Sequence, residues 1–158
     1  MRDFLQRRLV APLLVLLKQG VTPRKLALSL ALGIVIGLVP VLGISTALCA
    51  LVALALRLNM PAIQLVNYLL TPLQLLLIIP QLRFGEWLAR APRFPITLEA
   101  GLAALSHGVI NAVALLATAI VHATIGWLVA APLAAFLLFR ILEPVLRHLT
   151  PPSIQETR

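Results

Sequence analysis

The sequence predicts an all-α integral membrane protein that combines broken or re-entrant helical hairpins with a transmembrane helix pair. Hydrophobic residues make up 61% of its 158 residues and charged residues only 11%, whereas an ordinary soluble domain is about 45–50% apolar and about 25% charged. A soluble chain of about 150 residues hides only about 70% of its surface, too little for so many apolar side chains. The single cysteine, Cys49, excludes an internal disulfide. These observations place the chain in a lipid bilayer.

The charge pattern predicts how the chain lies in that bilayer. A formal net charge of +8 would indicate nucleic-acid binding in many soluble proteins. Here the basic residues lie between apolar blocks and form no stripe with aromatic side chains. Lys and Arg stay on the cytoplasmic side of a membrane, near anionic headgroups. We therefore expect a multi-pass protein of the bacterial inner membrane with a cytoplasmic N-terminus, membrane lipids as partners and no nucleic acid.

Residues 1–19 predict an interfacial amphipathic helix. Three arginines precede an apolar run that Pro12 interrupts, and this run is about half as long as a membrane-spanning helix. No small-residue cleavage site follows, so a secretory signal peptide is not expected. A helix lying at the headgroups fits this pattern, and residues 20–158 then form a single membrane domain.

The first uncharged block, residues 26–56, predicts a broken hairpin. As a single helix it would be about 46 Å long, too long for a bilayer without a strong tilt. It contains Gly37, Pro40 and Gly43, a proline with a glycine three residues away on each side. Proline removes a backbone donor and glycine permits a chain reversal. Two helical arms on either side of this break would form a re-entrant hairpin; one kinked and tilted span is the alternative.

The second uncharged block, residues 58–82, is predicted to be a broken hairpin as well. Asn59 and Pro61 supply a cap followed by a proline, Pro72 interrupts the block and Pro80 ends it. The two pieces are each about 12–15 Å long if helical, and neither can cross a membrane. Non-helical backbone at membrane depth is tolerated only inside protein or beside a water-filled cavity. The chain therefore needs an interior that is not lipid.

Residues 100–148 predict the transmembrane helix pair. A first crossing would cover about residues 101–125, a turn would follow near Gly126, and Pro132 would begin the second helix. If all three blocks are hairpins, every Lys and Arg outside the membrane lies on the cytoplasmic side. That arrangement satisfies the positive-inside rule without exception.

Polar residues inside the third block share one face of a helix. They recur at offsets 0, 4, 11 and 15 and fall within about 60° of the helix circumference. These residues are His107, Asn111, Thr118 and His122. Polar side chains in hydrocarbon need partners, so this face lies toward the bundle interior or water. It could form a substrate or proton path, or supply interhelical hydrogen bonds that only orient the bundle.

The second block carries a similar polar face. Its members are Gln64, Asn67, Thr71 and Gln74. Their side chains could satisfy backbone groups freed by Pro72, or they could coordinate a polar headgroup or an ion.

Small and hydroxyl residues of the first block have two expected roles. Ser29, Gly33 and Gly37 are spaced by four residues and permit close helix packing. Because a chain with so few helices cannot enclose a cavity alone, we expect a homo-oligomer packed through this face. Ser45 and Thr46 follow the first break, where a half-helix N-terminus could hold an anion.

No motif predicts catalysis. Paired carboxylates on one helical face, His and Cys at metal-ligand spacing, a P-loop and a dinucleotide fingerprint are all missing from the sequence. Cys49 lies in an apolar arm with no base nearby in the sequence. We expect no enzyme activity, no catalytic residue, no metal site and no cofactor.

Three motifs in the first half of the chain are shared with a known family. They are Thr22-Pro23-Arg24-Lys25 before an apolar run, the break marked by Gly37, Pro40 and Gly43, and Thr71-Pro72-Leu73. Over about residues 20–88 the chain resembles the bacterial membrane family of domain of unknown function 2062. Thr71, Gln74 and Ser45 stand where that family usually has Asn, Thr and Gln. Some members look fused to glycosyltransferase domains, so the resemblance implies a connection with lipid-linked sugars or envelope lipids. The broken-hairpin plan also looks similar to the DedA lipid-transport superfamily.

Two functions from different classes are consistent with these features. The first is transport of a lipid, a lipid-linked sugar or a small polar solute, because backbone breaks at membrane depth form the binding sites of transporters. The alternative is a non-transporting scaffold or accessory subunit of an envelope glycan or lipid pathway, for example one that anchors a glycosyltransferase. A membrane enzyme ranks third, for want of acid–base or nucleophile candidates. Transport by the purified protein in liposomes separates the first two.

Overall fold

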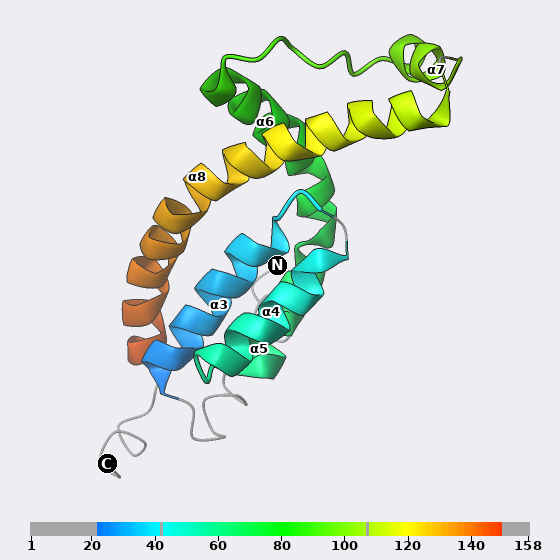
Figure 1. The fold of residues 1–158 in the computed structure, drawn as a ribbon. Coiled ribbons are helices and arrows are strands. Elements are labelled where there is room, and N and C mark those ends of the chain that lie inside the picture. The colour runs from blue at the N-terminus through cyan, green and yellow to red at the C-terminus, as the bar shows by residue number, and fades with distance from the viewer. Residues whose placement is uncertain (1–21, 42, 107, 150–158) are drawn as a thin grey trace, which may run out of the picture.

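The computed structural model describes residues 22–41, 43–106 and 108–149, and every regular element in these ranges is an α-helix. In chain order, the helices are α3 (Pro23–Gly37), α4 (Ile44–Ala55), α5 (Met60–Leu69), α6 (Thr71–Ala89), α7 (Leu98–Ser106) and α8 (Val109–Leu149) (Figure 1). The all-α prediction is therefore confirmed for these ranges. The interfacial helix predicted at residues 1–19 lies outside the described residues, as does His107.

Helices α3 and α4 form a hairpin whose outer ends lie close together. The side-chain oxygen of Thr22 accepts a backbone N–H at 3.3 Å and caps α3, which ends at Gly37. Gly43 has a φ of 86°, which non-glycine residues rarely adopt, and α4 starts directly after it. Beyond α4, the Asn59 N–H donates a hydrogen bond of 3.0 Å to Ser29 Oγ in α3. The chain thus returns to the end of the bundle from which α3 starts (Figure 1).

Helices α5 and α6 form one bent pair. Asn59 Oδ1 accepts the Ala62 N–H at 2.8 Å and caps α5. The axes of α5 and α6 differ by 65° across the break at Leu70. The prediction that Pro80 ends this block is wrong, because Pro80 lies inside α6, which continues to Ala89. A proline within a helix removes one backbone hydrogen bond, and the packing of α6 against α8 outweighs that loss.

Helix α8 is continuous over 41 residues. The predicted helix pair with a turn near Gly126 is therefore wrong, since Gly126 and Pro132 both lie inside α8. Gly126 serves a close crossing with α6: a Cβ atom at this position would lie 2.4 Å from the Gln81 carbonyl oxygen. Proline is accommodated by bending of the helix, and α8 curves around the bundle (Figure 1).

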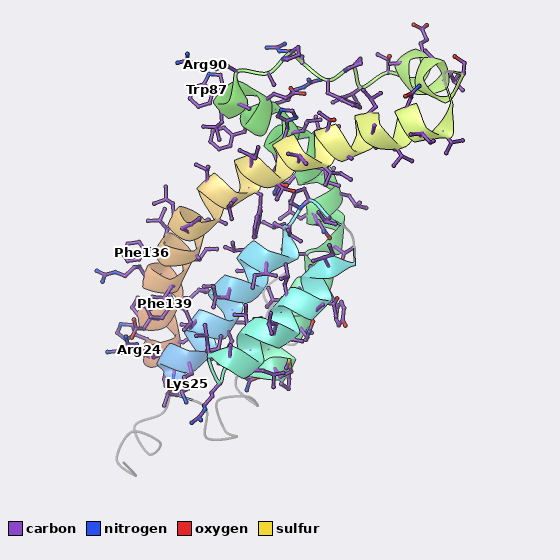
Figure 2. All side chains as sticks on the ribbon, in the orientation of Figure 1. Arg24, Lys25, Trp87, Arg90, Phe136 and Phe139 are labelled. Atoms are coloured by element: carbon purple, nitrogen blue, oxygen red, sulfur yellow. The ribbon has the colours of Figure 1, made fainter. Side chains whose placement is uncertain are left out.

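Basic residues lie at both ends of the bundle. Figure 2 shows Arg24 and Lys25 at one end and Arg90 at the other. The α5–α6 pair runs from the first end to the second, and α8 returns to the first, where Leu146 packs against Leu26 (Figure 1). The expectation that all basic residues lie on one side required three hairpins, and the second block does not meet this condition. The second block crosses the bundle where a hairpin would have turned back.

The glycines of α3 bring α5 close to it. A Cβ atom on Gly33 would lie 2.8 Å from the Ile63 carbonyl oxygen, and one on Gly37 would lie 3.2 Å from the Cα of Asn67. Ser29, on the same face, is buried as well. The face that was expected to join copies of the chain is therefore used within the chain, because α5 needs a close approach to α3.

The outside of the bundle is strongly apolar. Helix α8 is long and apolar enough to cross a membrane over Val109–His148, and only 11% of its most apolar window is buried. The bent pair of α5 and α6 would make a second span. Leu76, Trp87 and Ile110 are exposed over 72%, 72% and 85% of their surfaces.

Candidate functional site

The two helix breaks meet inside the bundle. Gln74 follows the break at Leu70, and its Nε2 donates to the carbonyl oxygen of Val39, in the break after α3, at 2.6 Å. Gln81, two turns further along α6, donates from Nε2 to the Leu38 carbonyl at 2.9 Å. The last carbonyls of a helix have no partner within that helix. The two glutamine amides therefore pair backbone groups that would otherwise be left without partners.

A third carbonyl at this end of α3 is paired from α8. Trp127 Nε1 donates to the Val35 carbonyl oxygen at 2.9 Å. Gln81 also contributes an acceptor that stays open, because its Oε1 is buried and has no hydrogen-bond partner within the described residues. Side chains from two helices thus hold the end of α3 and leave one buried acceptor free.

The polar face of α5 joins it to the first turn of α4. Gln64 Nε2 donates to the Thr46 carbonyl oxygen at 3.0 Å. Asn67 Nδ2 lies 3.3 Å from Thr46 Oγ1 and 3.4 Å from Gln64 Oε1. Ser45 is buried, while Thr71 is exposed at the start of α6 and lies outside this group. The amides of Gln64 and Gln74 donate to backbone carbonyls of α4 and the first break, and that of Asn67 to side chains, whereas the predicted partners were backbone groups freed by Pro72.

The polar stripe predicted on the third block does not join these amides. Thr118 Oγ1 donates to the Ala114 carbonyl at 2.9 Å, and His122 Nδ1 lies 2.8 Å from the Thr118 carbonyl oxygen. Asn111 and Thr118 are exposed. The half of α8 that carries these residues crosses α6, whereas the amides of α5 face α4 (Figure 1). A role for the stripe as a substrate path stays a prediction.

A cavity at the far end of α6 carries a second group of polar side chains, which sequence reasoning missed. Its volume is about 790 Å³, and we call it the arginine pocket. The lining residues are Arg83, Glu86, Trp87, Leu88, Arg90, Ala91 and Arg93. Three arginines and one glutamate leave the pocket with an excess of two positive charges.

Glu86 organises the wall of the arginine pocket. Its side chain is only 3% exposed. Oε1 accepts the Phe94 N–H at 2.7 Å, and Oε2 accepts Arg83 Nη1 at 2.9 Å. The same arginine nitrogen donates to the Phe94 carbonyl oxygen at 3.1 Å. Hydrogen bonds between ionised groups are the strong ones, and these bonds fold the connection after α6 back onto the helix.

Arg90 and Arg57 share an uncommon backbone conformation. Each has a φ of 51°, in the left-handed region that costs a non-glycine residue about 1–2 kcal/mol. Arg90 directly follows the last residue of α6, and Arg57 lies two residues after the last residue of α4. After α6, the Ala91 N–H donates to the Glu86 carbonyl at 3.0 Å, and the equivalent bond after α4 is 2.8 Å. Glycine usually occupies this left-handed position at a helix end, so both arginines carry a backbone cost that glycine would avoid.

An apolar groove of about 300 Å³ lies between α6 and α8. The side chains that form its two walls include Leu77, Pro80 and Phe84 of α6 and Trp127, Ala130 and Ala134 of α8. Phe84 stacks on Trp87 of the arginine pocket with 5.9 Å between the ring centroids. Phe84 of the groove therefore touches Trp87 of the arginine pocket, so the two linings are neighbours along α6.

The sequence contains a signal for the arginine pocket. Arg83, Glu86, Trp87 and Arg90 follow one another at intervals of three, one and three residues, which places them on one side of a helix. The prediction that Pro80 ends the second block hides this pattern, because it leaves all four residues outside any predicted helix.

Over the described ranges, the fold and the site define a bundle of α-helices with an apolar helix long enough to span a membrane and two polar centres along α6. A bacterial family described as "Uncharacterized protein conserved in bacteria (DUF2062)" matches residues 6–151. The chain belongs to this family, and the resemblance predicted from the motifs at its two breaks is confirmed. No curated protein and no solved structure matches the chain.

Proposed function

We propose that this chain is an integral protein of the bacterial inner membrane that transports or translocates a lipid, a lipid-linked sugar or a small polar solute. The observation that carries the proposal is the meeting of two broken helices, where Gln74 at one break pairs with Val39 at the other. In transporters, discontinuous helices supply backbone groups to a binding site within the bilayer. A protein that only crosses a membrane has no need of such breaks, because each one leaves backbone groups that require partners.

The exposed apolar surface supports insertion into a bilayer. Soluble monomers rarely expose contiguous apolar patches of more than a few hundred Å², whereas large apolar side chains are exposed along most of α8. In this proposal α8 and the bent α5–α6 pair are two crossings. The α3–α4 hairpin enters and leaves on one side. Val39 and Pro40, in its irregular segment, are buried in protein, where such backbone is tolerated at membrane depth.

Charge supports an orientation with the start of α3 on the cytoplasmic side. Arg24 and Lys25 lie at this end (Figure 2), and four further basic residues precede them in the sequence. Basic residues are retained on the cytoplasmic side of membrane proteins. The arginine pocket, at the end where Arg90 lies, then faces the outer side of the inner membrane.

Lipid scrambling in proteoliposomes tests the proposal. A fluorescent phospholipid is distributed over both leaflets and dithionite is added outside. We expect the protein to allow bleaching of more than the outer-leaflet half. Gln74→Leu, which removes the donor that links the two breaks, should change the rate, whereas Thr71→Ala, an exposed neighbour, should not. A plateau at the outer-leaflet half for the wild-type protein would refute translocation of that lipid.

A non-transporting scaffold is the second candidate, and one observation favours it. The side-chain nitrogens of Gln64, Asn67 and Gln74 already have partners within the protein. Their hydrogen bonds stabilise the fold and need no ligand. A scaffold would leave scrambling at the outer-leaflet half and would bind an envelope enzyme, such as a glycosyltransferase. Co-purification of the full chain with such an enzyme from crosslinked membranes distinguishes this candidate from the first.

A further inference from the structure

We propose that the arginine pocket binds the phosphate group of an anionic membrane lipid and that the groove between α6 and α8 holds its acyl chain. Such lipid binding rests on the proposed membrane location but requires no movement of the lipid across the bilayer. Pocket and groove lie on the same helix and meet at the stacked pair Phe84–Trp87. A ligand with a charged head and an apolar tail matches a charged pocket that lies beside an apolar groove.

The charges of the arginine pocket favour a phosphate. Both carboxylate oxygens of Glu86 are engaged by Arg83 and Phe94. Within the described residues, neither Arg90 nor Arg93 forms an ion pair. Two guanidinium groups are thus available, and their planar sets of donors match the oxygens of a phosphate better than an ammonium group does.

The backbone that carries these two arginines is held in place at both ends. The Ala91 N–H bonds to the Glu86 carbonyl, and the Phe94 N–H bonds to the Glu86 side chain. Arg90 keeps its left-handed φ of 51° between these anchors. Strained conformations persist where the surrounding structure determines them, and they cluster at ligand-binding sites. The guanidinium groups therefore start from a backbone that is already ordered before the ligand binds.

The position of the pocket fits a headgroup. Arg90 and Trp87 lie at the end of the bundle opposite Arg24 and Lys25 (Figure 2), where the positive-inside rule disfavours arginine. Trp87 is 72% exposed, and tryptophan is enriched at the level of lipid headgroups. Three arginines on the outer side of the membrane are explained by an anionic headgroup at the same depth.

The groove fits an acyl chain. Apart from Gln81, its lining residues are apolar, and the small residues Ala130 and Ala134 line it on α8. From the aromatic pair its α6 wall runs past Pro80 to Leu77, away from the arginine pocket along α6. A lipid with its phosphate at the arginines would therefore place its chain at the depth at which acyl chains lie in a bilayer.

The two tryptophans of the chain report on the two parts of this site, since Trp87 lines the pocket and Trp127 lines the groove. The full-length protein is placed in nanodiscs of phosphatidylcholine, and phosphatidic acid with brominated acyl chains is titrated in. We expect saturable quenching of tryptophan fluorescence at a mole fraction at least about tenfold lower than brominated phosphatidylcholine requires. Inorganic phosphate in a parallel titration should not displace the brominated lipid.

Arg90→Gly and Arg57→Gly form a matched pair of variants. Both relieve the same left-handed conformation at the end of a helix, but only Arg90 lines the pocket. Loss of a hydrogen bond to a charged group corresponds to about tenfold or more in affinity. We therefore expect Arg90→Gly and Arg93→Gln to lose the preference for phosphatidic acid by about that factor, with circular dichroism unchanged. Arg57→Gly should bind as the wild type does.

Several outcomes would overturn the inference. Equal quenching by the two brominated lipids would show that the phosphate is not selected. Displacement by inorganic phosphate would make the pocket a site for the free ion and would exclude the groove from binding. If Arg57→Gly lost the preference for phosphatidic acid equally, the loss would come from a glycine at either helix end and not from the side chain of Arg90. Selective binding without scrambling, in contrast, would refute translocation and support the lipid site.

Discussion

Replacing Gly85 by alanine is expected to push α6 and α8 apart. A Cβ atom on Gly85 would lie 1.7 Å from the His122 carbonyl oxygen and 2.5 Å from its carbonyl carbon. Both are backbone atoms of α8, so no side-chain rotation can make room. The distance to the oxygen must grow by about 1.7 Å to reach the 3.4 Å at which ordinary contact begins.

Two opposing effects determine how much Gly85→Ala changes the free energy of unfolding. Alanine is preferred to glycine inside a helix by about 0.5–1 kcal/mol. Overpacking of a well-packed contact costs about 1–3 kcal/mol, occasionally more. Because the obstacle is backbone on both helices, the cost lies at the upper end of this range. The net loss is about 2 kcal/mol, equivalent to a Tm lower by roughly 4–8 °C for a chain of this size.

Thermal unfolding in detergent, followed by far-UV circular dichroism, measures this loss. Gly126→Ala should behave in the same way, because its Cβ atom would lie 2.4 Å from the Gln81 carbonyl oxygen. Gly43→Ala is the control: its Cβ atom would meet nothing within 4 Å, so it should cost only about 1–2 kcal/mol for the left-handed φ. A Tm of Gly85→Ala at or above the wild-type value would refute a backbone-to-backbone crossing of α6 and α8.

Three further predictions concern the breaks and the caps, and the same unfolding experiment measures each. Gln74→Leu should lower stability by about 1–3 kcal/mol, because the buried Val39 carbonyl loses its partner; no change would mean that water replaces the amide. Arg57→Gly should raise stability by up to about 1 kcal/mol, since relief of the left-handed φ exceeds the lost attraction to the helix end; a lower Tm would contradict this balance. Asn59→Ala should cost about 0.5–2 kcal/mol through the lost cap of α5, and an unchanged Tm would indicate that the Ser29 contact alone holds this turn.

The helix starts and the first break were predictable because their causes are local. Thr22 and Asn59 cap their helices with their own side chains, and Gly43 adopts the φ that glycine permits. These effects act over three or four residues, so the sequence around each position is sufficient to predict them.

The path of the chain after these breaks was less predictable. Pro80 and Pro132 have the same local cost as Pro40, but they lie inside helices. The loss of a backbone hydrogen bond at a proline is outweighed when the helix packs against a long neighbour. Gly126 differs from the prediction for a related reason, since it permits a close crossing of α6 and α8 and makes no turn. Whether a glycine or proline bends the chain therefore depends on what lies beside it.

In the candidate site, too, some features have local causes in the sequence and others depend on distant contacts. The polar face of the second block was visible in the sequence, but its partners were not, because Gln74 and Gln81 bond to carbonyls 35 and 43 residues away. The arginine pocket requires that α6 continue beyond Pro80 and that Phe94 fold back onto Glu86. Neither event has a cause within a few residues.

The sequence by itself determined the all-helical class, the apolar character of the helices, the caps and the glycine at the first break, because composition and local backbone preferences act on each residue separately. Only the tertiary structure decided that one long helix stands where a pair was predicted, which carbonyls the glutamines satisfy, and that three arginines surround one cavity. These features depend on contacts between residues far apart in the chain. The free energy of such contacts exceeds the local cost of a proline or an arginine in an unfavourable conformation.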